Sequence, residues 1–216
     1  MILSYNDIKD RVEKYKNYGD VYENNNPKVL IEKFNKKNLQ SASYDISIGS
    51  EFMVQNKTIA TIDLSSKAEI EKVFVKKSIH DDYIIEPNEF ILVMIDEKIN
   101  MPDDLSASVR PRTSFNKLGL VLTNQHINPS YSGNLYVGLK NVSNNAYIIK
   151  PGLKIGQIIF ETLSSEIPEE FLYRNKKDSK YQNEGREYIH SKVYNEFKKE
   201  NLEEALKIIK EEMASE

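Results

Sequence analysis

Residues 127–141 have the sequence Ile127-Asn-Pro-Ser-Tyr-Ser-Gly-Asn-Leu-Tyr-Val-Gly-Leu-Lys-Asn141. The first half has the Pro, Ser, Asn and Gly composition of a turn. In the second half apolar residues alternate with a period of two, which is typical of a β-strand and places Leu135, Val137 and Leu139 on one face. Gly138 therefore lies on the opposite face. A glycine within a strand often marks a close approach by a ligand or another backbone.

On both sides of this segment, short apolar or alternating runs are separated by turn residues. They fall at residues 43–48, 51–54, 58–64, 83–85, 90–95, 105–109, 118–122, 135–139, 147–149 and 155–160. Many short strands at fairly regular spacing, without long helical patterns between them, are typical of all-β folds. The sequence therefore predicts a mainly β protein, with a distorted barrel or a jelly-roll sandwich from about residue 29 to residue 163.

Helical patterns occur near the two ends of the chain. Ser4 is a candidate N-cap with Asp7 three residues later, and Ile8, Val12 and Tyr15 follow at helical spacing. Near the C-terminus an apolar stripe is formed by Phe197, Leu202, Ala205, Leu206, Ile209 and Met213. We therefore predict a short N-terminal helix and a C-terminal amphipathic helix, with loops at 17–28 and 168–185.

The composition suits one globular domain with a short appendage. Of the 216 residues, 39% are hydrophobic, which is enough for one substantial core. The 33 acidic and 30 basic residues give a net charge of −3 without a long basic run, which argues against a nucleic-acid-binding surface. No apolar run approaches the roughly 18 residues that a membrane span needs. We expect a cytoplasmic protein that binds neither nucleic acid nor membrane.

Zinc-dependent deamination of a base uses a His and two Cys as metal ligands, and the chain has no Cys. Its three histidines, His80, His126 and His190, lack the spacing of a ligand pair. The chain also lacks the glycine-rich loops of P-loop and dinucleotide-binding proteins and the Gly-x-Ser-x-Gly elbow of hydrolases. We therefore expect no zinc site and none of these enzyme classes.

A candidate phosphate-binding segment is Arg112-Thr-Ser-Phe-Asn-Lys117. Hydroxyl, guanidinium and ammonium groups are the donors that phosphate oxygens need, and this segment contains all three. Arg110 adds a further cation, although a solvated strand charge is its more ordinary interpretation. Asp45, within Ala42-Ser-Tyr-Asp-Ile-Ser-Ile-Gly49, would taken alone be a residue that caps a turn.

Ordered blocks at residues 42–49, 112–120, 127–141, 151–160 and 173–185 resemble the dCTP deaminase branch of the dUTPase superfamily in order and spacing. The resemblance covers about residues 1–190 and leaves residues 191–216 as a C-terminal helical extension. It implies a distorted β-barrel of the dUTPase-like type and a homotrimer with pockets between subunits. It also implies dCTP or dUTP as the ligand and Mg²⁺ bound with the triphosphate.

The resemblance gives individual residues a role in nucleotide binding. The implied phosphate contacts are Arg112, Thr113, Ser114, Lys117, Tyr173 and Lys180, and the further contacts are Asn124, Asn128, Tyr136 and Glu184. Asp45 would support the trimer core and the base of the pocket. Glu184 stands where the family usually has Gln, so its carboxylate would repel phosphate unless it turned outward or held Mg²⁺.

The chain departs from the family pattern at the positions that handle protons. The usual Asp is Asn128, the usual catalytic Glu is Gly138, and Lys117 replaces an Arg. An amide has no useful basicity near neutral pH and glycine has no side chain, so neither can act as a general base. The ionisable side chain that could substitute is His126.

We therefore predict a protein that binds a deoxynucleoside triphosphate, with impaired or altered conversion of dCTP and water to dUTP and ammonia. One alternative is a catalytically silent nucleotide sensor or partner-binding regulator. Another is a nucleotide hydrolase or deaminase with a different base preference, because the loss of the Glu side chain at Gly138 would enlarge the pocket.

Overall fold

The computed structural model describes residues 1–16, 30–58, 61–78, 82–185 and 187–198, together with the single helical residues Glu203, Leu206, Lys207, Lys210 and Met213. It divides into two compact units, residues 1–54 with 76–188 and residues 55–75 with 189–216. All the candidate nucleotide-binding residues belong to the first unit. The predicted domains at 1–190 and 191–216 stay a prediction.

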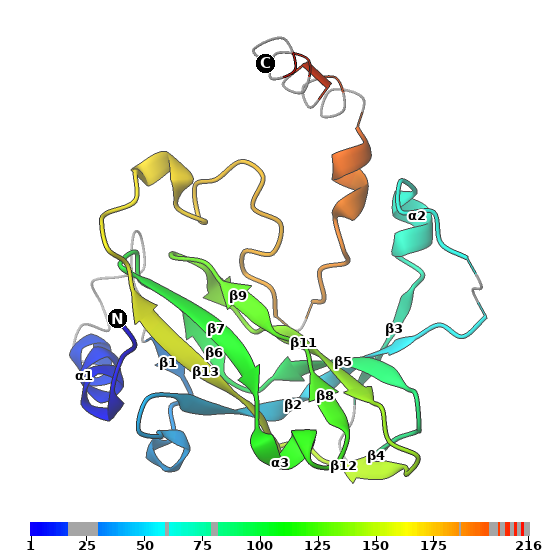
Figure 1. Ribbon diagram of the computed structural model, residues 1–216, viewed down its shortest axis with the longest axis horizontal. Helices are drawn as coiled ribbons and strands as arrows, with labels where there is room; N and C mark the ends of the chain where they lie inside the picture. The colour runs from blue at the N-terminus through cyan, green and yellow to red at the C-terminus, as the bar shows by residue number, and fades with distance from the viewer. Residues whose placement is uncertain are drawn as a thin grey trace. The chain divides into compact units, whose positions relative to one another are not determined.

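The first unit is built around one antiparallel sheet (Figure 1). Its strands follow in the spatial order β8 (Leu120–Leu122), β11 (Tyr136–Asn141), β5 (Phe90–Ile95), β2 (Tyr44–Gln55), β13 (Lys154–Thr162), β7 (Leu105–Pro111) and β9 (Gln125–Ile127). A further strand, β3 (Phe74–Ser78), pairs with β2 beside this path. The prediction of a mainly β protein is confirmed.

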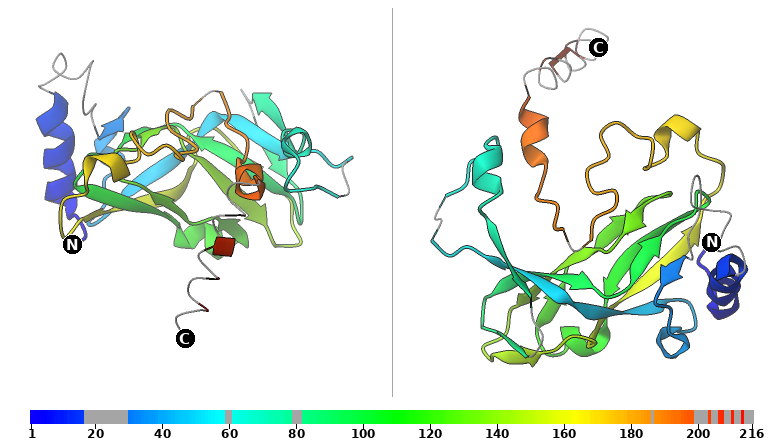
Figure 2. Two further views of the ribbon diagram at one scale, coloured as in Figure 1. Left: turned by 90° about the horizontal axis from the view of Figure 1, so that it is seen from above. Right: turned by 180° about the vertical axis from the view of Figure 1, so that it is seen from behind.

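The sheet curls because a very short connection joins its two ends. β8 and β9 stand at opposite ends of the strand order, yet only Thr123 and Asn124 separate them along the chain. Gln125 on β9 donates a hydrogen bond from Nε2 to the main-chain oxygen of Tyr136 on β11, at 2.9 Å. The two ends of the sheet therefore meet, and Figures 1 and 2 show the resulting curl.

Two smaller sheets complete the first unit. One has the order β1 (Ile31–Glu32), β6 (Lys98–Asn100) and β10 (Ser132–Gly133), and the other pairs β4 (Tyr83–Ile85) with β12 (Tyr147–Ile149). The strands β4, β5 and β12 have the predicted bounds, whereas the two runs predicted at 43–48 and 51–54 form the single strand β2. The strands β1, β3, β6, β9 and β10 were not predicted, because they are short or largely polar.

The strand predicted at 58–64 is wrong. Thr58 and residues 61–64 have turn or irregular backbone. Asn56 accepts the main-chain N–H of Thr58 at 3.2 Å, and Asp63 accepts that of Ser65 at 2.8 Å. Such local side-chain bonds compete with a β-ladder, and here they outweigh the apolar pattern. The chain continues into α2 (Lys67–Ile70), which is capped by the side chain of Ser66.

The alternating apolar residues form one core. Fully buried side chains come from five strands: Ile46, Ile48, Phe52, Ile91, Val93, Val109, Val137, Leu139, Ile158 and Phe160. Full burial of a Val, Ile, Leu or Phe side chain stabilises the fold by about 1.5–3 kcal/mol. Because Val137 and Leu139 face this core, Gly138 between them faces away from it, as predicted.

The predicted N-terminal helix is α1 (Tyr5–Lys16). Its cap is reciprocal, because the main-chain N–H of Ser4 donates to the Asp7 carboxylate at 2.9 Å and that of Asp7 donates to Ser4 Oγ at 3.5 Å. Ile8 and Val12 are fully buried, so the apolar stripe of α1 packs on the barrel. Other short helical turns are η1 (Lys36–Asn38), α3 (Thr113–Asn116), η2 (Glu169–Phe171) and η3 (Val193–Phe197).

Most of the predicted C-terminal amphipathic helix lies outside the described residues, as does the predicted loop at 17–28. Of its apolar stripe, Phe197, Leu206 and Met213 are described, and all three are exposed. Within the part of the chain that the structure describes, no helix is long and apolar enough to cross a membrane.

Candidate functional site

Gly138 lies in β11 where the two ends of the sheet meet. Its register partner on β5 is Leu92. On the other side, Thr123 donates its main-chain N–H to the Gly138 oxygen at 2.8 Å and accepts the Gly138 N–H on Oγ1 at 2.9 Å. Both the N–H and the oxygen of Gly138 therefore bond to Thr123, which holds the main chain from that side.

The space that a side chain at residue 138 would need is filled. A Cβ atom built on Gly138 would lie 2.6 Å from Cζ and 2.7 Å from Cε2 of Phe90, and 2.8 Å from Cγ2 of Thr123. Real Cβ atoms essentially never come this close to other heavy atoms. The expectation that Gly138 enlarges a pocket is therefore wrong, because an aromatic ring and a methyl group occupy the volume.

Tyr136 shares the outward face of β11 with Gly138. It is buried, and the ring of Tyr188 stands edge-on to it with 5.0 Å between centroids. Burial raises the pKa of the Tyr136 hydroxyl, and the charges of Glu51 and Glu184 raise it further. Among the described residues, neither this hydroxyl nor Oε1 of Gln125 has a hydrogen-bond partner. Buried polar atoms are normally paired, so a ligand or a second subunit is a candidate partner for both.

Glu184 faces inward. It is 8% exposed. After the larger effect of burial, its negative charge raises the pKa of the Tyr131 and Tyr188 hydroxyls. Glu184 therefore does not turn outward to solvent. Its predicted contact with the nucleotide stays a prediction, and a buried negative charge disfavours a direct contact with phosphate.

The C-terminal segment from Tyr173 to Glu184 is tied to the loop around β10. The Tyr173 hydroxyl accepts the main-chain N–H groups of Lys180 at 3.2 Å and Tyr181 at 2.9 Å. Tyr173 therefore folds its own segment, in addition to any contact with phosphate. Gln182 donates to the main-chain oxygen of Ser130 at 3.1 Å, which fixes the end of the segment.

Gly133 allows this segment to come close. A Cβ atom at Gly133 would lie 2.5 Å from the Tyr131 hydroxyl oxygen and 2.7 Å from the main-chain oxygen of Glu184. The neighbouring Asn134 donates its main-chain N–H to the same Glu184 oxygen at 2.7 Å. Because one obstacle is main chain, a side chain at 133 would displace the C-terminal segment.

Arg174 and Gln182 were missed by the sequence analysis. The Arg174 guanidinium pairs with Asp103, and its Nη2 lies 2.9 Å from Asp103 Oδ2 and 3.1 Å from Glu169 Oε1. Its main-chain N–H donates to Ser130 Oγ at 3.0 Å. No periodicity or spacing in the sequence connects residues 103 and 174, so nothing in the local pattern could have predicted this anchor.

Four of the residues predicted to bind phosphate, Arg112, Thr113, Ser114 and Lys117, lie together at the end of β7. Arg112 directly follows the strand, α3 forms a single turn, and Lys117 is the C-cap of that turn. Buried Phe115 anchors the turn to the core. Thr113, Ser114 and Lys117 are exposed, so their hydroxyl and ammonium groups are accessible to an anion.

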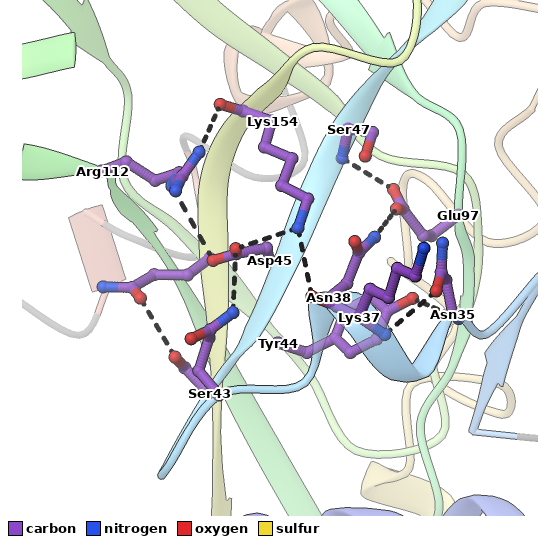
Figure 3. Close-up of polar contacts among 12 residues, drawn as sticks. Asn35, Lys37, Asn38, Ser43, Tyr44, Asp45, Ser47, Glu97, Arg112 and Lys154 are labelled. Atoms are coloured by element: carbon purple, nitrogen blue, oxygen red, sulfur yellow. Dashed lines mark hydrogen bonds and ion pairs between the residues drawn. The ribbon is translucent and has the colours of Figure 1, made fainter. Parts of the chain in front are cut away.

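A buried carboxylate holds Arg112 in place (Figure 3). The side chain of Asp45 is 5% exposed, with Oδ1 3.8 Å from Arg112 Nε and Oδ2 3.6 Å from Lys154 Nζ. Gln40 donates to Oδ2 at 3.2 Å, and Arg112 Nη1 donates to the main-chain oxygen of Lys154 at 3.2 Å. Two cations share one carboxylate, so the cluster has a formal charge of +1, which suits an anion. Asp45 is placed to orient Arg112.

Within one protomer the predicted site residues form two groups. β7 and β9 are antiparallel with Ala107 opposite Ile127, so Asn128 lies beside the start of β7 while Arg112 follows its end. At about 3.3 Å per residue the two ends are roughly 20 Å apart. Tyr173 belongs to the Asn128 group, since its main-chain N–H donates to the oxygen of Pro129 at 3.4 Å. Lys180 lies in the same group through its bond to Tyr173.

The two remaining positions lie near β9. Asn124 is exposed in the connection that follows Thr123. His126 is also exposed, and because side chains alternate along a strand it points away from the face from which Gln125 reaches Tyr136. Within one protomer His126 is therefore not directed at Gly138, and its role as a substitute base stays a prediction.

No group of three His, Asp or Glu side chains that could hold a metal ion occurs among the described residues. His80 lies outside them. A metal ion at this site would therefore need other ligands, such as the oxygens of a bound phosphate chain.

Comparison with known proteins gives a consistent result. Residues 2–163 match the family model described as dCTP deaminase-like. A dCTP deaminase, dUMP-forming, of Methanosphaera stadtmanae is 32% identical over 186 residues, covering 83% of this chain and 88% of that protein. A dCTP deaminase of Natronomonas pharaonis is 30% identical, covering 84% of this chain and 90% of that protein.

One solved structure supports the fold. The 2'-deoxycytidine 5'-triphosphate deaminase of Agrobacterium tumefaciens superimposes with a TM-score of 0.56 over 74% of this chain, at 19% identity. The match spans 48% of that protein's length. The predicted dUTPase-like barrel is thereby confirmed.

Proposed function

This chain belongs to the dCTP deaminase-like family, and from that premise we propose that it binds a deoxynucleoside triphosphate, dCTP or dUTP, and deaminates cytosine poorly or not at all. Two observations support binding. The curated relatives are named as enzymes acting on dCTP. The segment after β7 presents exposed hydroxyl and ammonium groups beside a cluster with excess positive charge, and these are the groups that phosphate needs.

The proposal of impaired catalysis is supported by one observation, that residue 138 itself supplies no proton acceptor. Residue 138 has no side chain, and the volume beside it contains a ring and a methyl group. Asn128 is an amide and cannot take up a proton near neutral pH. A general base must lie within hydrogen-bond reach of the group that it serves, and its loss lowers the rate by about 10²- to 10⁴-fold.

In the proposed complex the phosphate chain contacts Arg112, Thr113, Ser114, Lys117, Tyr173 and Lys180, while Asn128 holds the sugar. Lys117 neutralises phosphate as a point charge but lacks the planar fork of arginine, so it orients the ligand less strictly. Mg²⁺ would be held by phosphate oxygens and water, in keeping with its usual binding to nucleotides.

We propose a homotrimer in which two subunits share each site. The reason is the distance of roughly 20 Å between the Arg112 group and the Asn128 group of one protomer. A single nucleotide can contact both groups only if they come from different subunits. The unpaired polar atoms of Tyr136 and Gln125 also suit burial against a second subunit.

A catalytically silent nucleotide sensor or partner-binding regulator is the second candidate function. The apolar filling beside Gly138 favours it, because such a site can retain a ligand without transferring protons. An enzyme with a different base preference has less support, since the enlarged pocket that suggested it is absent.

Binding and turnover can be tested separately on the wild-type protein. A ligand present at 100 times its Kd stabilises the fold by about 2.7 kcal/mol, and 1 kcal/mol shifts the Tm of a protein this large by about 2–4 °C. We therefore expect dCTP or dUTP with Mg²⁺ to raise the Tm by several degrees, while chromatography finds little conversion. No shift with any deoxynucleotide at millimolar concentration would contradict binding. Turnover at about 1 s⁻¹ or faster would contradict impaired catalysis.

A further inference from the structure

Lys154 shares a carboxylate with Arg112 but was not among the residues expected to bind a nucleotide. It is the first residue of β13, and it lies beside the end of β7 because Pro111 is opposite Gly156 in the β7–β13 pair. Arg112 donates from Nη1 to the main-chain oxygen of Lys154 at 3.2 Å. Lys154 therefore belongs with the Arg112 group of candidate residues and not with the Asn128 group.

The two cations keep donors for an anion. Nε of Arg112 lies 3.8 Å from Asp45 Oδ1, and Nζ of Lys154 lies 3.6 Å from Oδ2. Both distances exceed that of a hydrogen bond. Within the described part of the chain, the Arg112 guanidinium donates one hydrogen bond and the Lys154 ammonium donates one, to the main-chain oxygen of Lys37 at 3.2 Å. A guanidinium has five N–H donors and an ammonium has three, so most of these donors can still bind another acceptor.

A short turn holds the Lys154 ammonium in place. Lys37 is in η1, and the N-cap residue Asn35 accepts the Lys37 N–H on Oδ1 at 3.0 Å. The main-chain N–H of Asn35 donates to the Tyr44 hydroxyl at 2.9 Å, and Tyr44 is fully buried. The oxygen that accepts from Lys154 is therefore fixed to the core. A long side chain that is already held in one position loses less conformational entropy when it binds a ligand.

The cations are accessible and the carboxylate is not. The side chains of Arg112 and Lys154 are 35% and 32% exposed, whereas that of Asp45 is 5% exposed. Figure 3 shows the two cationic side chains reaching Asp45 from different sides. An anion from the solvent can therefore contact the two cations, while the carboxylate that would repel it stays buried. Phosphate oxygens accept hydrogen bonds from both kinds of cation.

We propose that Lys154 is a phosphate-contacting residue of the nucleotide site and that it makes binding depend on the length of the phosphate chain. The inference rests on the proposed function. Thr113 and Lys117 follow Arg112 along the chain, and Lys154 adds a cation from the neighbouring strand β13. Lys154 contacts a phosphate beyond the first one. The ligand class is therefore a nucleoside di- or triphosphate, because a longer chain brings more charge and more acceptor oxygens to these donors.

Calorimetry with dCTP, dCDP and dCMP, each with Mg²⁺, tests the proposal on the full chain. Lys154→Met keeps a long apolar side chain but removes the charge, and it should weaken dCTP by about tenfold. It should weaken dCMP by less than about twofold, because a charge without direct contact is screened. Lys154→Arg keeps the charge and should bind dCTP within about threefold of the wild type.

The matched control is Lys150→Met. It removes the same charge from the same part of the chain, but Lys150 pairs with Asp82 in an exposed ion pair. This variant should bind all three nucleotides as the wild type does. Weakening of dCTP by Lys150→Met equal to that by Lys154→Met would overturn the proposal, because the effect would then come from net charge and not from a contact.

The other results separate the two proposals. If the wild type binds no nucleotide, the proposed function fails and this inference fails with it. If the wild type binds dCTP and Lys154→Met binds it equally well, only the inference on Lys154 is overturned. Equal weakening of dCTP and dCMP by Lys154→Met would also overturn it, because the lost contact would then not depend on the later phosphates.

A second measurement uses the wild type alone and is independent of any folding defect in the variants. Acetylation of lysine side chains is followed by mass spectrometry with dCTP and Mg²⁺, with inorganic triphosphate as a probe that lacks base and sugar, and without ligand. Both ligands at saturation should slow the acetylation of Lys154 by about threefold or more and leave that of Lys150 unchanged. A Lys154 side chain that reacts at the same rate when dCTP is bound would overturn the proposal.

Discussion

Two clusters in the same sheet differ in how they treat a carboxylate. In the first, Asp45 is present, buried, and shared by Arg112 and Lys154. In the second, the carboxylate expected of the family is absent, and the ring of Phe90 fills the space beside Gly138. The difference teaches that charge for holding an anion and groups for moving a proton are separable, since they depend on different strands and different contacts.

The largest effect is expected when a carboxylate is placed at position 138. Gly138→Glu alone should stay inactive, because the new side chain collides with Phe90. The triple variant Gly138→Glu, Phe90→Ala, Asn128→Asp should gain dCTP deamination of about 10²-fold or more over the wild type. Chromatographic assay of product measures the effect. A single Gly138→Glu variant as active as the triple variant would show that Phe90 is no obstacle.

Removing the other carboxylate should mainly affect stability. Asp45→Ala leaves Arg112 and Lys154 without their shared partner. We expect a loss of roughly 2 kcal/mol in the free energy of unfolding, below the 3–5 kcal/mol of a fully buried pair because both cations are about one-third exposed.

Denaturant unfolding at neutral pH measures the Asp45 effect. The matched control is Lys150→Ala, which breaks an exposed pair with Asp82 and should change stability by less than about 0.5 kcal/mol. Equal effects of Asp45→Ala and Lys150→Ala would mean that the buried cluster has no special importance.

A smaller effect on stability is expected when only a methyl group is added at position 138. Gly138→Ala places a methyl group against Phe90 and Thr123 and should cost about 1–2 kcal/mol in unfolding free energy. Gly185→Ala is the control, because the nearest neighbour of its new methyl group would be Asn134 Oδ1 at 3.7 Å, an ordinary contact. Adding Phe90→Leu should recover part of the loss in a double-mutant cycle, and simple additivity would argue against contact between the two positions.

The smallest effect concerns Glu97, a buried carboxylate near the first cluster that accepts hydrogen bonds from the Asn38 amide and the Ser47 N–H, both of them neutral (Figure 3). Burial raises its pKa above 4.5, and the charge of Asp96 adds to this, while the N–H of Ser47 opposes it. The folded state then binds the proton more tightly than the unfolded state. Stability from this group is therefore fully present below pH 4.5 and declines as pH rises to the folded pKa.

Glu97→Gln should remove that pH dependence. Unfolding free energies measured from pH 4 to pH 8 should decline less with rising pH in Glu97→Gln than in the wild type. Identical pH profiles would show that burial of Glu97 does not penalise its charge. Asp45 differs from Glu97 in having two cations beside it. The two variants therefore compare a buried carboxylate that is paired with cations and one that is not.

Much of the barrel followed from the sequence because its strands have local signals. Short apolar runs located β4, β5 and β12, and alternation with a period of two placed Gly138 on the outward face of β11. Local signals failed at residues 58–64, where Asn56 and Asp63 bond to nearby main chain, and at the short polar strand β9.

The candidate site was less predictable. The residues around Arg112 were found together because they are consecutive in the chain. The filling beside Gly138 was not foreseen, since it depends on the register of β5 against β11, and a slip of one residue would turn Phe90 to the other face. The anchoring of Tyr173 and Gln182 likewise depends on contacts between segments distant in the chain.

The sequence by itself determined the strand pattern and the identities of Asn128 and Gly138, neither of which can act as a general base, because both follow from the residues themselves and their immediate neighbours. Only the tertiary structure decided that Phe90 and Thr123 occupy the volume beside Gly138 and that Arg112 and Asn128 lie roughly 20 Å apart along β7. Those outcomes depend on strand register and close packing, which bring together residues that no local pattern connects.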